Sequence, residues 1–141
     1  MSWLIVAKIP LLISSRIVPL DLSGLETIAF DRTGGTIGFI DGRGPATADA
    51  RSGARAGPEC PKLRWQRICR LGGLPVAVGN EGQRVGWTRL DTGSTTYAQL
   101  GPAITAAAGT EDGSMIAVCL HGGVGYSHVH FCDALSGERL G

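Results

Sequence analysis

Short apolar stretches, each opened by a glycine and separated by polar turns, recur along the chain. The clearest three begin at Gly35, Gly73 and Gly113 and continue into largely aliphatic residues. No stretch of twelve residues lacks both glycine and proline. Long helices are therefore disfavoured, because a helix interior loses about 1 kcal/mol for each glycine and about 3 kcal/mol for each proline. The pattern predicts an all-β chain of short strands joined by tight turns.

The glycines also mark an internal repeat. From Gly35 to Gly73 is 38 residues, and from Gly73 to Gly113 is 40. Each segment closes on a small hydroxyl residue and a glycine, and these closing glycines are Gly53, Gly93 and Gly137, 40 and 44 residues apart. A period near forty accommodates four strands of about five residues with their turns. It predicts three four-stranded units.

The repeats resemble those of the WD-repeat β-propeller family. In the third repeat, residues 111–118 and 129–137 resemble the family's second and third strands and its Trp-Asp-x-x-(Ser/Thr)-Gly ending. In the first repeat, residues 28–31 resemble the first strand and residues 49–53 the same ending, while the second repeat ends at residues 89–93. The resemblance implies a partial or degenerate β-propeller built from about three four-stranded blades of roughly forty residues.

The signature residues of that family are only partly kept. Its tryptophan is replaced by Ala48, Thr88 and Cys132. The aspartate that follows it is kept in the first and third repeats and is replaced by Arg89 in the second, and Gly101-Pro102 stands where a Gly-His dipeptide is expected. In the family these side chains tie the turns of a blade together by hydrogen bonds. Their loss affects the rigidity of the blades and leaves the strand pattern intact.

Four segments are expected from this organisation. Residues 1–23 are two N-terminal strands that fit the outer part of a preceding blade, and residues 24–61 are repeat 1, whose stretch 42–61 reads as a Gly/Pro-rich linker. Residues 62–100 and 101–141 are repeats 2 and 3. Closed propellers need about four to eight blades, since closure protects the sheet edges, and three blades cannot close. We expect a fragment, an arc completed by another copy, or a terminal piece of a longer propeller.

The first twenty residues are the sole candidate for a targeting segment. Lys8 and Arg16 interrupt the apolar run, and Pro10 and Pro19 divide it. A spanning helix needs about 20 mostly apolar residues, and a signal peptide needs basic residues before its apolar region and a small-residue cleavage site after it. Neither pattern fits, so two short strands and a cytoplasmic protein without membrane contact are predicted.

Charge and cysteine content narrow the possible partners. Thirteen basic and twelve acidic side chains leave a net charge of +1, so no global field favours nucleic acid, an anionic membrane or an acidic substrate. The cysteines have no paired spacing, which indicates reduced thiols. They are Cys60, Cys69, Cys119 and Cys132.

One motif suggests an enzyme. Leu90-Asp91-Thr92-Gly93-Ser94-Thr95 resembles the nucleophile-activating loop of an aspartic protease. Such enzymes set two carboxylates side by side to share one proton, so a small retroviral-type subunit with one loop must dimerise. The same turn recurs without its aspartate at Arg51-Ser52-Gly53 and Leu135-Ser136-Gly137, which the repeat explains and a protease does not. The dimeric protease is therefore the alternative function.

A basic and aromatic cluster lies in the second repeat. Trp65 is surrounded by Lys62, Arg64, Arg67 and Arg70. Such a cluster is able to grip phosphates and stack bases. Edge strands carry Lys and Arg for another reason, to block pairing between edges. Nothing else in the chain supports nucleic acid binding, so the cluster is interpreted as a solvated strand edge.

The third repeat carries five metal-ligand types within fourteen positions. These are Cys119, His121, His128, His130 and Cys132. Pairing apolar residues across the hairpin sets Val118 opposite Phe131 and Leu120 opposite Val129. That register puts all five donors on one surface, close enough for three or four of them to ligate zinc. The alternative is that the cysteines merely pack, with Cys132 filling the missing tryptophan position.

The predicted function is non-catalytic. The chain is interpreted as a WD-repeat-like scaffold for protein–protein interaction, or as part of a larger propeller, whose partners are other proteins, further blades or a second copy. No residue is assigned as catalytic, cofactor-binding or metal-binding, and no nucleic acid partner is expected. The protease at Asp91-Thr92-Gly93 and the metal-binding hairpin remain alternatives.

Overall fold

The computed structural model describes residues 28–122 and 125–140. In this part of the chain there are eleven strands and no helix, so the predicted all-β fold is confirmed. No helix that is long and apolar enough to span a bilayer occurs among these residues. The two predicted N-terminal strands at residues 1–23 lie outside the described residues.

The first sheet is an antiparallel meander in the order β1-β2-β3-β4. Its strands are β1 (Ile28–Phe30), β2 (Thr36–Asp41), β3 (Gly44–Asp49) and β4 (Arg55–Ala56). The stretch 42–61, expected as a Gly/Pro-rich linker, is a linker only in part, because β3 and β4 lie within it. Pro45 is accommodated in the second position of β3, directly after the hairpin turn.

The second sheet repeats this meander in the order β5-β6-β7-β8. Its strands are β5 (Arg64–Leu71), β6 (Leu74–Glu81), β7 (Arg84–Arg89) and β8 (Thr95–Gln99). The third sheet has β9 (Ile104–Gly109), β10 (Met115–His121) and β11 (Ser127–Asp133) in the order β9-β10-β11. A bridge between Cys132 and Arg139 places a short fourth segment beside β11.

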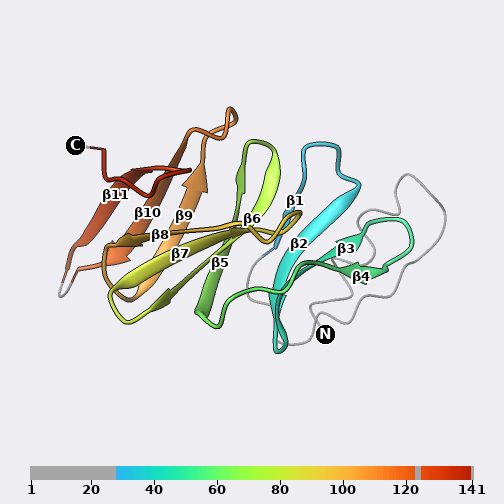
Figure 1. The fold of residues 1–141 in the computed structure, drawn as a ribbon, viewed down its shortest axis with the longest axis horizontal. Helices are drawn as coiled ribbons and strands as arrows, with labels where there is room; N and C mark the ends of the chain where they lie inside the picture. Colours follow the sequence, from blue (N-terminus) through green and yellow to red (C-terminus); the bar gives the residue numbers. More distant parts are fainter. Residues whose placement is uncertain (1–27, 123–124, 141) are drawn as a thin grey trace.

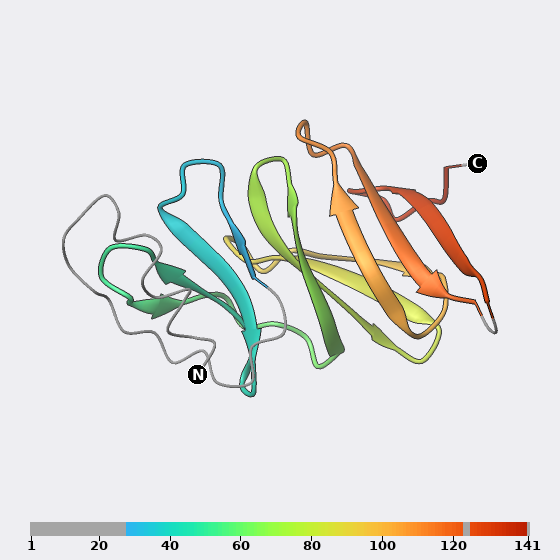
Figure 2. The same cartoon turned by 180° about the vertical axis from the view of Figure 1, so that it is seen from behind.

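The three sheets follow one another along the length of the molecule (Figures 1 and 2). The first strand of each sheet contacts the first strand of the next, so that β1 lies against β5 and β5 against β9. This succession of antiparallel meanders, whose first strands lie next to one another, is the arrangement of propeller blades.

Side chains alternate between two faces of each sheet, and the second strand of each sheet shows which face is which. On β6, Ala77 joins a buried cluster with Ile40 of the first sheet. Val78 joins a different buried cluster with Ile116 of the third sheet. One face of the second sheet therefore meets the first sheet, and the other face meets the third.

Two buried clusters lie between the sheets. The cluster between the second and third sheets includes thirteen buried residues, among them Val78, Trp87 and Ile116. The cluster between the first and second sheets includes four, namely Ile40, Ile68, Ala77 and Leu90. A third cluster, centred on Ile37 and Phe39, lies on the other face of the first sheet.

The closing glycines form the same turn three times. The Gly53 amide donates to Asp49 O, Gly93 to Arg89 O and Gly137 to Asp133 O, at 2.8 to 2.9 Å. All three glycines have positive φ, between 74° and 81°, which a residue with a Cβ adopts only with strain. The repeated glycine in the sequence thus reports a repeated backbone geometry.

Main-chain hydrogen bonds also link the turns that follow the inner strands. The amide of Arg32, after β1, donates to Gly73 O in the β5–β6 turn at 2.8 Å. The amide of Gly72 in that same turn donates to Thr110 O, after β9, at 2.9 Å. These linked turns tie the three sheets together at one end of the inner strands.

Candidate functional site

The third sheet presents an apolar surface that no other sheet of the described chain covers. We call it the outer face, and its apolar residues are Ala106, Ala108, Met115, Ala117, Cys119, Val129 and Phe131. Val129 is 54% exposed and Phe131 46%. In the second sheet the corresponding face, which carries Val78, is buried against the third sheet. The outer face is therefore a blade-to-blade surface without a blade on it.

The register of the β10–β11 hairpin differs by one residue from the prediction. Val118 lies opposite His130, and Cys119 lies opposite Val129. Since side chains alternate, a one-residue shift moves every side chain of β11 to the other face. Val129 and Phe131 thus lie on the outer face, with Cys119 and His121. His128, His130 and Cys132 lie on the face that meets the second sheet.

The predicted metal-binding hairpin is therefore wrong as a single five-donor surface. Among residues 28–122 and 125–140, no group of three or more Cys, His, Asp or Glu side chains is placed to hold a metal ion. The physical reason is burial. Cys132 is fully buried and lies opposite Ile116, and this determines which residues of β11 face the second sheet. His128 and His130 follow on the same face, with Tyr126 edge-on to His128 at 5.3 Å between ring centroids.

None of the four cysteines forms a disulfide. Burial raises the pKa of the Cys69 thiol to about 12 and also raises the pKa of Cys60 and Cys132. Since the thiolate is the nucleophile and metal ligand, these three thiols are held in their unreactive form at neutral pH. These three cysteines contribute to packing.

The protease-like motif lies in the turn between β7 and β8. The guanidinium of Arg89 donates two hydrogen bonds to the carboxylate of Asp91, at 2.7 Å from Nη2 and 3.1 Å from Nε. In the other two repeats the aspartate sits two positions earlier and accepts from turn amides instead, as Asp49 does from Arg51 and Ser52. Arg89 thus occupies the position of that turn aspartate and engages Asp91.

The basic cluster around Trp65 is divided by the fold. Arg67 turns toward the third sheet, where its Nε donates to Thr105 O at 2.9 Å. Trp65 is half-buried and packs against the cluster between the first and second sheets. Arg64 and Arg70 are exposed on β5, the first strand of its sheet. Arg67 and Trp65 are thus engaged by two different neighbouring sheets.

A cavity lies beside β3, β4 and the connection 57–63. Its volume is about 710 Å³, and its charged lining residues are Arg43, Arg55, Glu59 and Lys62. Trp65 and several prolines form apolar parts of the wall. Sequence reasoning missed this cavity, because most of its lining residues lie in the stretch 42–61, which was interpreted as a linker.

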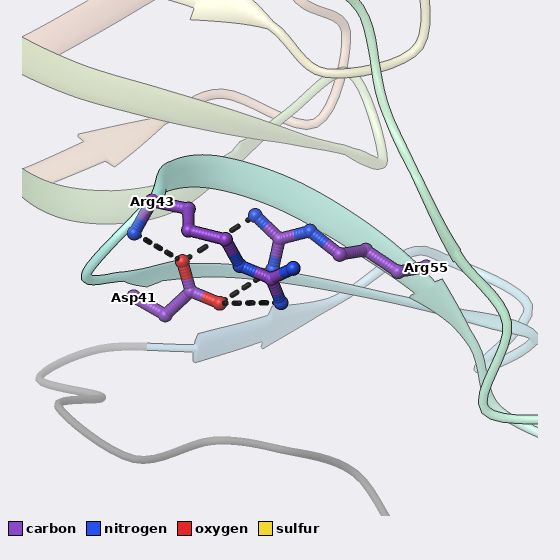
Figure 3. A network of polar contacts seen from close by, with 3 residues as sticks. All are labelled: Asp41, Arg43 and Arg55. Atoms are coloured by element: carbon purple, nitrogen blue, oxygen red, sulfur yellow. Dashed lines mark hydrogen bonds and ion pairs between the residues drawn. The ribbon is translucent and has the colours of Figure 1, made fainter.

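An ion-pair network organises one side of this cavity (Figure 3). The carboxylate of Asp41 lies between Arg43 and Arg55. It accepts two hydrogen bonds from the Arg55 guanidinium and one, at 2.8 Å, from the Arg43 amide. Arg55 also lies over the ring of Phe39, 5.2 Å from its centroid. The Arg55 side chain is therefore fixed, whereas the Arg43 side chain is 65% exposed.

Comparison with known proteins bears on the fold. No protein-family model matches the chain, and no curated protein matches it. Solved structures do resemble it, among them the following three. Hydrazine synthase of Kuenenia stuttgartiensis has a TM-score of 0.68 and 17% identity over 85% of this chain and 35% of that chain. A chain of a nidogen/laminin complex has a TM-score of 0.65 and 10% identity, over 82% of this chain and 46% of that chain. Apo AztD from Citrobacter koseri has a TM-score of 0.57 and 18% identity, over 89% of this chain and 34% of that chain.

These neighbours are β-propeller-type folds, so the predicted propeller architecture is confirmed at the level of fold. At such low identities the likeness concerns the fold alone. The chain spans between about a third and a half of the length of the structures that it matches.

Proposed function

We propose that this chain is a non-catalytic, WD-repeat-like arc of a larger β-propeller, which serves as a scaffold for protein partners in the cytoplasm. The observation that carries the proposal is the outer face of the third sheet. An apolar sheet face of this kind is covered wherever a following sheet exists in the chain. Val129 and Phe131, about half exposed, are the side chains that a further blade or a second copy would cover.

The energetics support an assembled form. Burying a large apolar side chain such as Phe131 is worth about 1.5–3 kcal/mol relative to leaving it in water. Contiguous apolar surface of this sort marks interaction sites in folded proteins. The structural neighbours, of which this chain spans a third to a half, are consistent with an arc that needs further blades.

The repeated closing turns support the WD-repeat part of the proposal. Asp49 and Asp133 occupy the position of the family's aspartate, and each accepts hydrogen bonds from the amides of the turn that follows. These bonds lower the pKa of both carboxyl groups. The four unpaired thiols are compatible with the reducing environment of the cytoplasm.

The proposal is tested by measuring the size of the purified chain by light scattering over a range of concentrations. We expect association at micromolar concentration that Phe131→Asp weakens, because the charge lies on the outer face. Leu135→Asp is the matched control, since Leu135 is 84% exposed in a turn outside that face. A stable wild-type monomer with a sharp unfolding transition would contradict the proposal that the three sheets are an arc that needs further blades or a second copy.

The non-catalytic part has its own test at Asp91. Its carboxylate pairs with Arg89, so Asp91→Asn should change no peptidase activity. A pepstatin-sensitive activity that disappears in this variant would replace the scaffold by the dimeric protease.

A further inference from the structure

We propose that the cavity beside β4 binds an acidic, extended peptide segment of a partner protein. The cavity is separate from the outer face: it lies against the first sheet and the connection 57–63, whereas the outer face belongs to the third sheet. This binding site goes beyond the assembly of blades and does not depend on it.

The charge of the lining sets the sign of the ligand. Three basic side chains, Arg43, Arg55 and Lys62, face one acidic side chain, Glu59. Asp41 is not a lining residue, and its side chain is only 5% exposed because the two arginines enclose it. The Arg43 guanidinium, 3.7 Å from Asp41, and the exposed Lys62 ammonium remain accessible. A carboxylate-bearing ligand complements this lining.

The apolar walls of the cavity favour a ligand that carries apolar groups as well as an acidic one. Pro45, Pro58, Pro61 and Trp65 line the cavity together with the charged groups. Flat proline and tryptophan rings offer contact surface for apolar side chains at little entropic cost. A volume of about 710 Å³ has room for several side chains. The ligand therefore alternates acidic and apolar groups.

The backbone beside the cavity favours an extended conformation of the ligand. Arg55 and Ala56 form β4, which within residues 28–122 and 125–140 is the last strand of its sheet and pairs with β3 alone. Both residues line the cavity. A peptide lying along an unpaired edge gains main-chain hydrogen bonds, while side-chain pockets supply its specificity.

The experiment measures the fluorescence anisotropy of a labelled eight-residue peptide of alternating Glu and Leu, titrated with the full chain. Matched peptides replace Glu by Gln or by Lys. The test variant is Arg43→Gln with Lys62→Gln, and the control is Arg70→Gln with Arg139→Gln, which removes the same charge at exposed positions outside the cavity. We expect saturable binding of the Glu peptide, about tenfold weaker in the test variant and within about twofold of wild type in the control.

Four results would overturn the proposal: no saturable binding, equal binding of the Gln peptide, equal weakening in the control variant, and displacement by inorganic phosphate at the concentration of the peptide. The last of these would leave a simple anion site. Repeating the titration with Phe131→Asp separates this site from the outer face. Binding should persist in that variant whether or not the chain associates.

Discussion

The two contacts between neighbouring sheets are built differently. Between the second and third sheets, large side chains fill the space, and the Trp87 indole Nε1 donates to Ala134 O at 2.9 Å in a buried position. Between the first and second sheets, the buried cluster is smaller, and the Gly38 backbone lies so close to the Pro75 and Leu90 side chains that a Cβ on Gly38 would overlap the Pro75 ring. One contact is filled by large side chains, whereas the other has a glycine where a side chain would not fit.

A single strand makes both contacts. On β6, Val76 and Val78 point to the third sheet, while Pro75 and Ala77 point to the first. The alternation of larger and smaller residues along one strand thus sets a different kind of contact on each face. The propeller pattern does not require neighbouring blades to be joined by similar residues.

The largest expected effect comes from emptying the side-chain contact. Trp87→Ala should lower the free energy of unfolding by about 3–5 kcal/mol, because it leaves a cavity and removes the only protein donor recorded for Ala134 O in the described residues. Urea denaturation followed by circular dichroism measures the change. Trp65→Ala, at a half-buried tryptophan of the smaller contact, is the control and should cost less. Equal losses would mean that the two contacts do not differ as described.

An intermediate effect is expected from adding a methyl group at Gly38, where the first sheet lies close to the Pro75 side chain. Gly38→Ala should destabilise the chain by about 1–3 kcal/mol, since the added methyl group meets the Pro75 ring and forces the first two sheets apart. Thermal denaturation is a suitable measurement. Gly42→Ala provides the control, because a Cβ at Gly42 meets no atom within 4 Å. If both variants melt at the same temperature, the contact between the first and second sheets does not depend on the absence of a side chain at Gly38.

The smallest effect concerns acid stability at the β9–β10 turn. Hydrogen bonds from Ser114 and Thr110 lower the pKa of Asp112 to about 2, below its ordinary value of 3.8. A lowered pKa in the folded state means stability that is present above about pH 4 and lost as the pH falls toward 2. Asp112→Asn should flatten this part of the pH dependence.

The acid prediction is measured by urea unfolding at pH values between 5 and 2. Glu111→Gln is the neighbouring control, and we expect its profile to follow that of the wild type. An unchanged slope in Asp112→Asn would show that the turn hydrogen bonds contribute nothing to acid stability.

The parts of the fold that could be predicted from the sequence are those fixed by the backbone. Gly53, Gly93 and Gly137 were recognisable because a positive φ leaves glycine as the residue with least strain. The strands after Gly35, Gly73 and Gly113 were recognisable because their apolar residues are buried between sheets. The period then gave the meander of each sheet without any knowledge of side-chain contacts.

The hairpin register could not be predicted, because β11 carries apolar residues on both of its faces. Phe131 and Val129 are larger and more apolar than Cys132, yet Cys132 is the buried one. Pairing by hydrophobicity assumes that the apolar face points to the core, and this fails for a sheet at the end of a stack. The cavity was missed for a different reason: Asp41, Arg43 and Arg55 meet only because β2, β3 and β4 fold back on one another.

The linked turns tolerate changes in their side chains. The bonds from Arg32 to Gly73 and from Gly72 to Thr110 join main-chain atoms, so they do not depend on the side chains that the turns carry. The three turns differ accordingly: the β5–β6 turn is a glycine pair, while Asp31 and Asp112 organise the other two through their carboxylates. Substitutions in these turns can therefore change the side chains while the main-chain bonds that align the three sheets are kept.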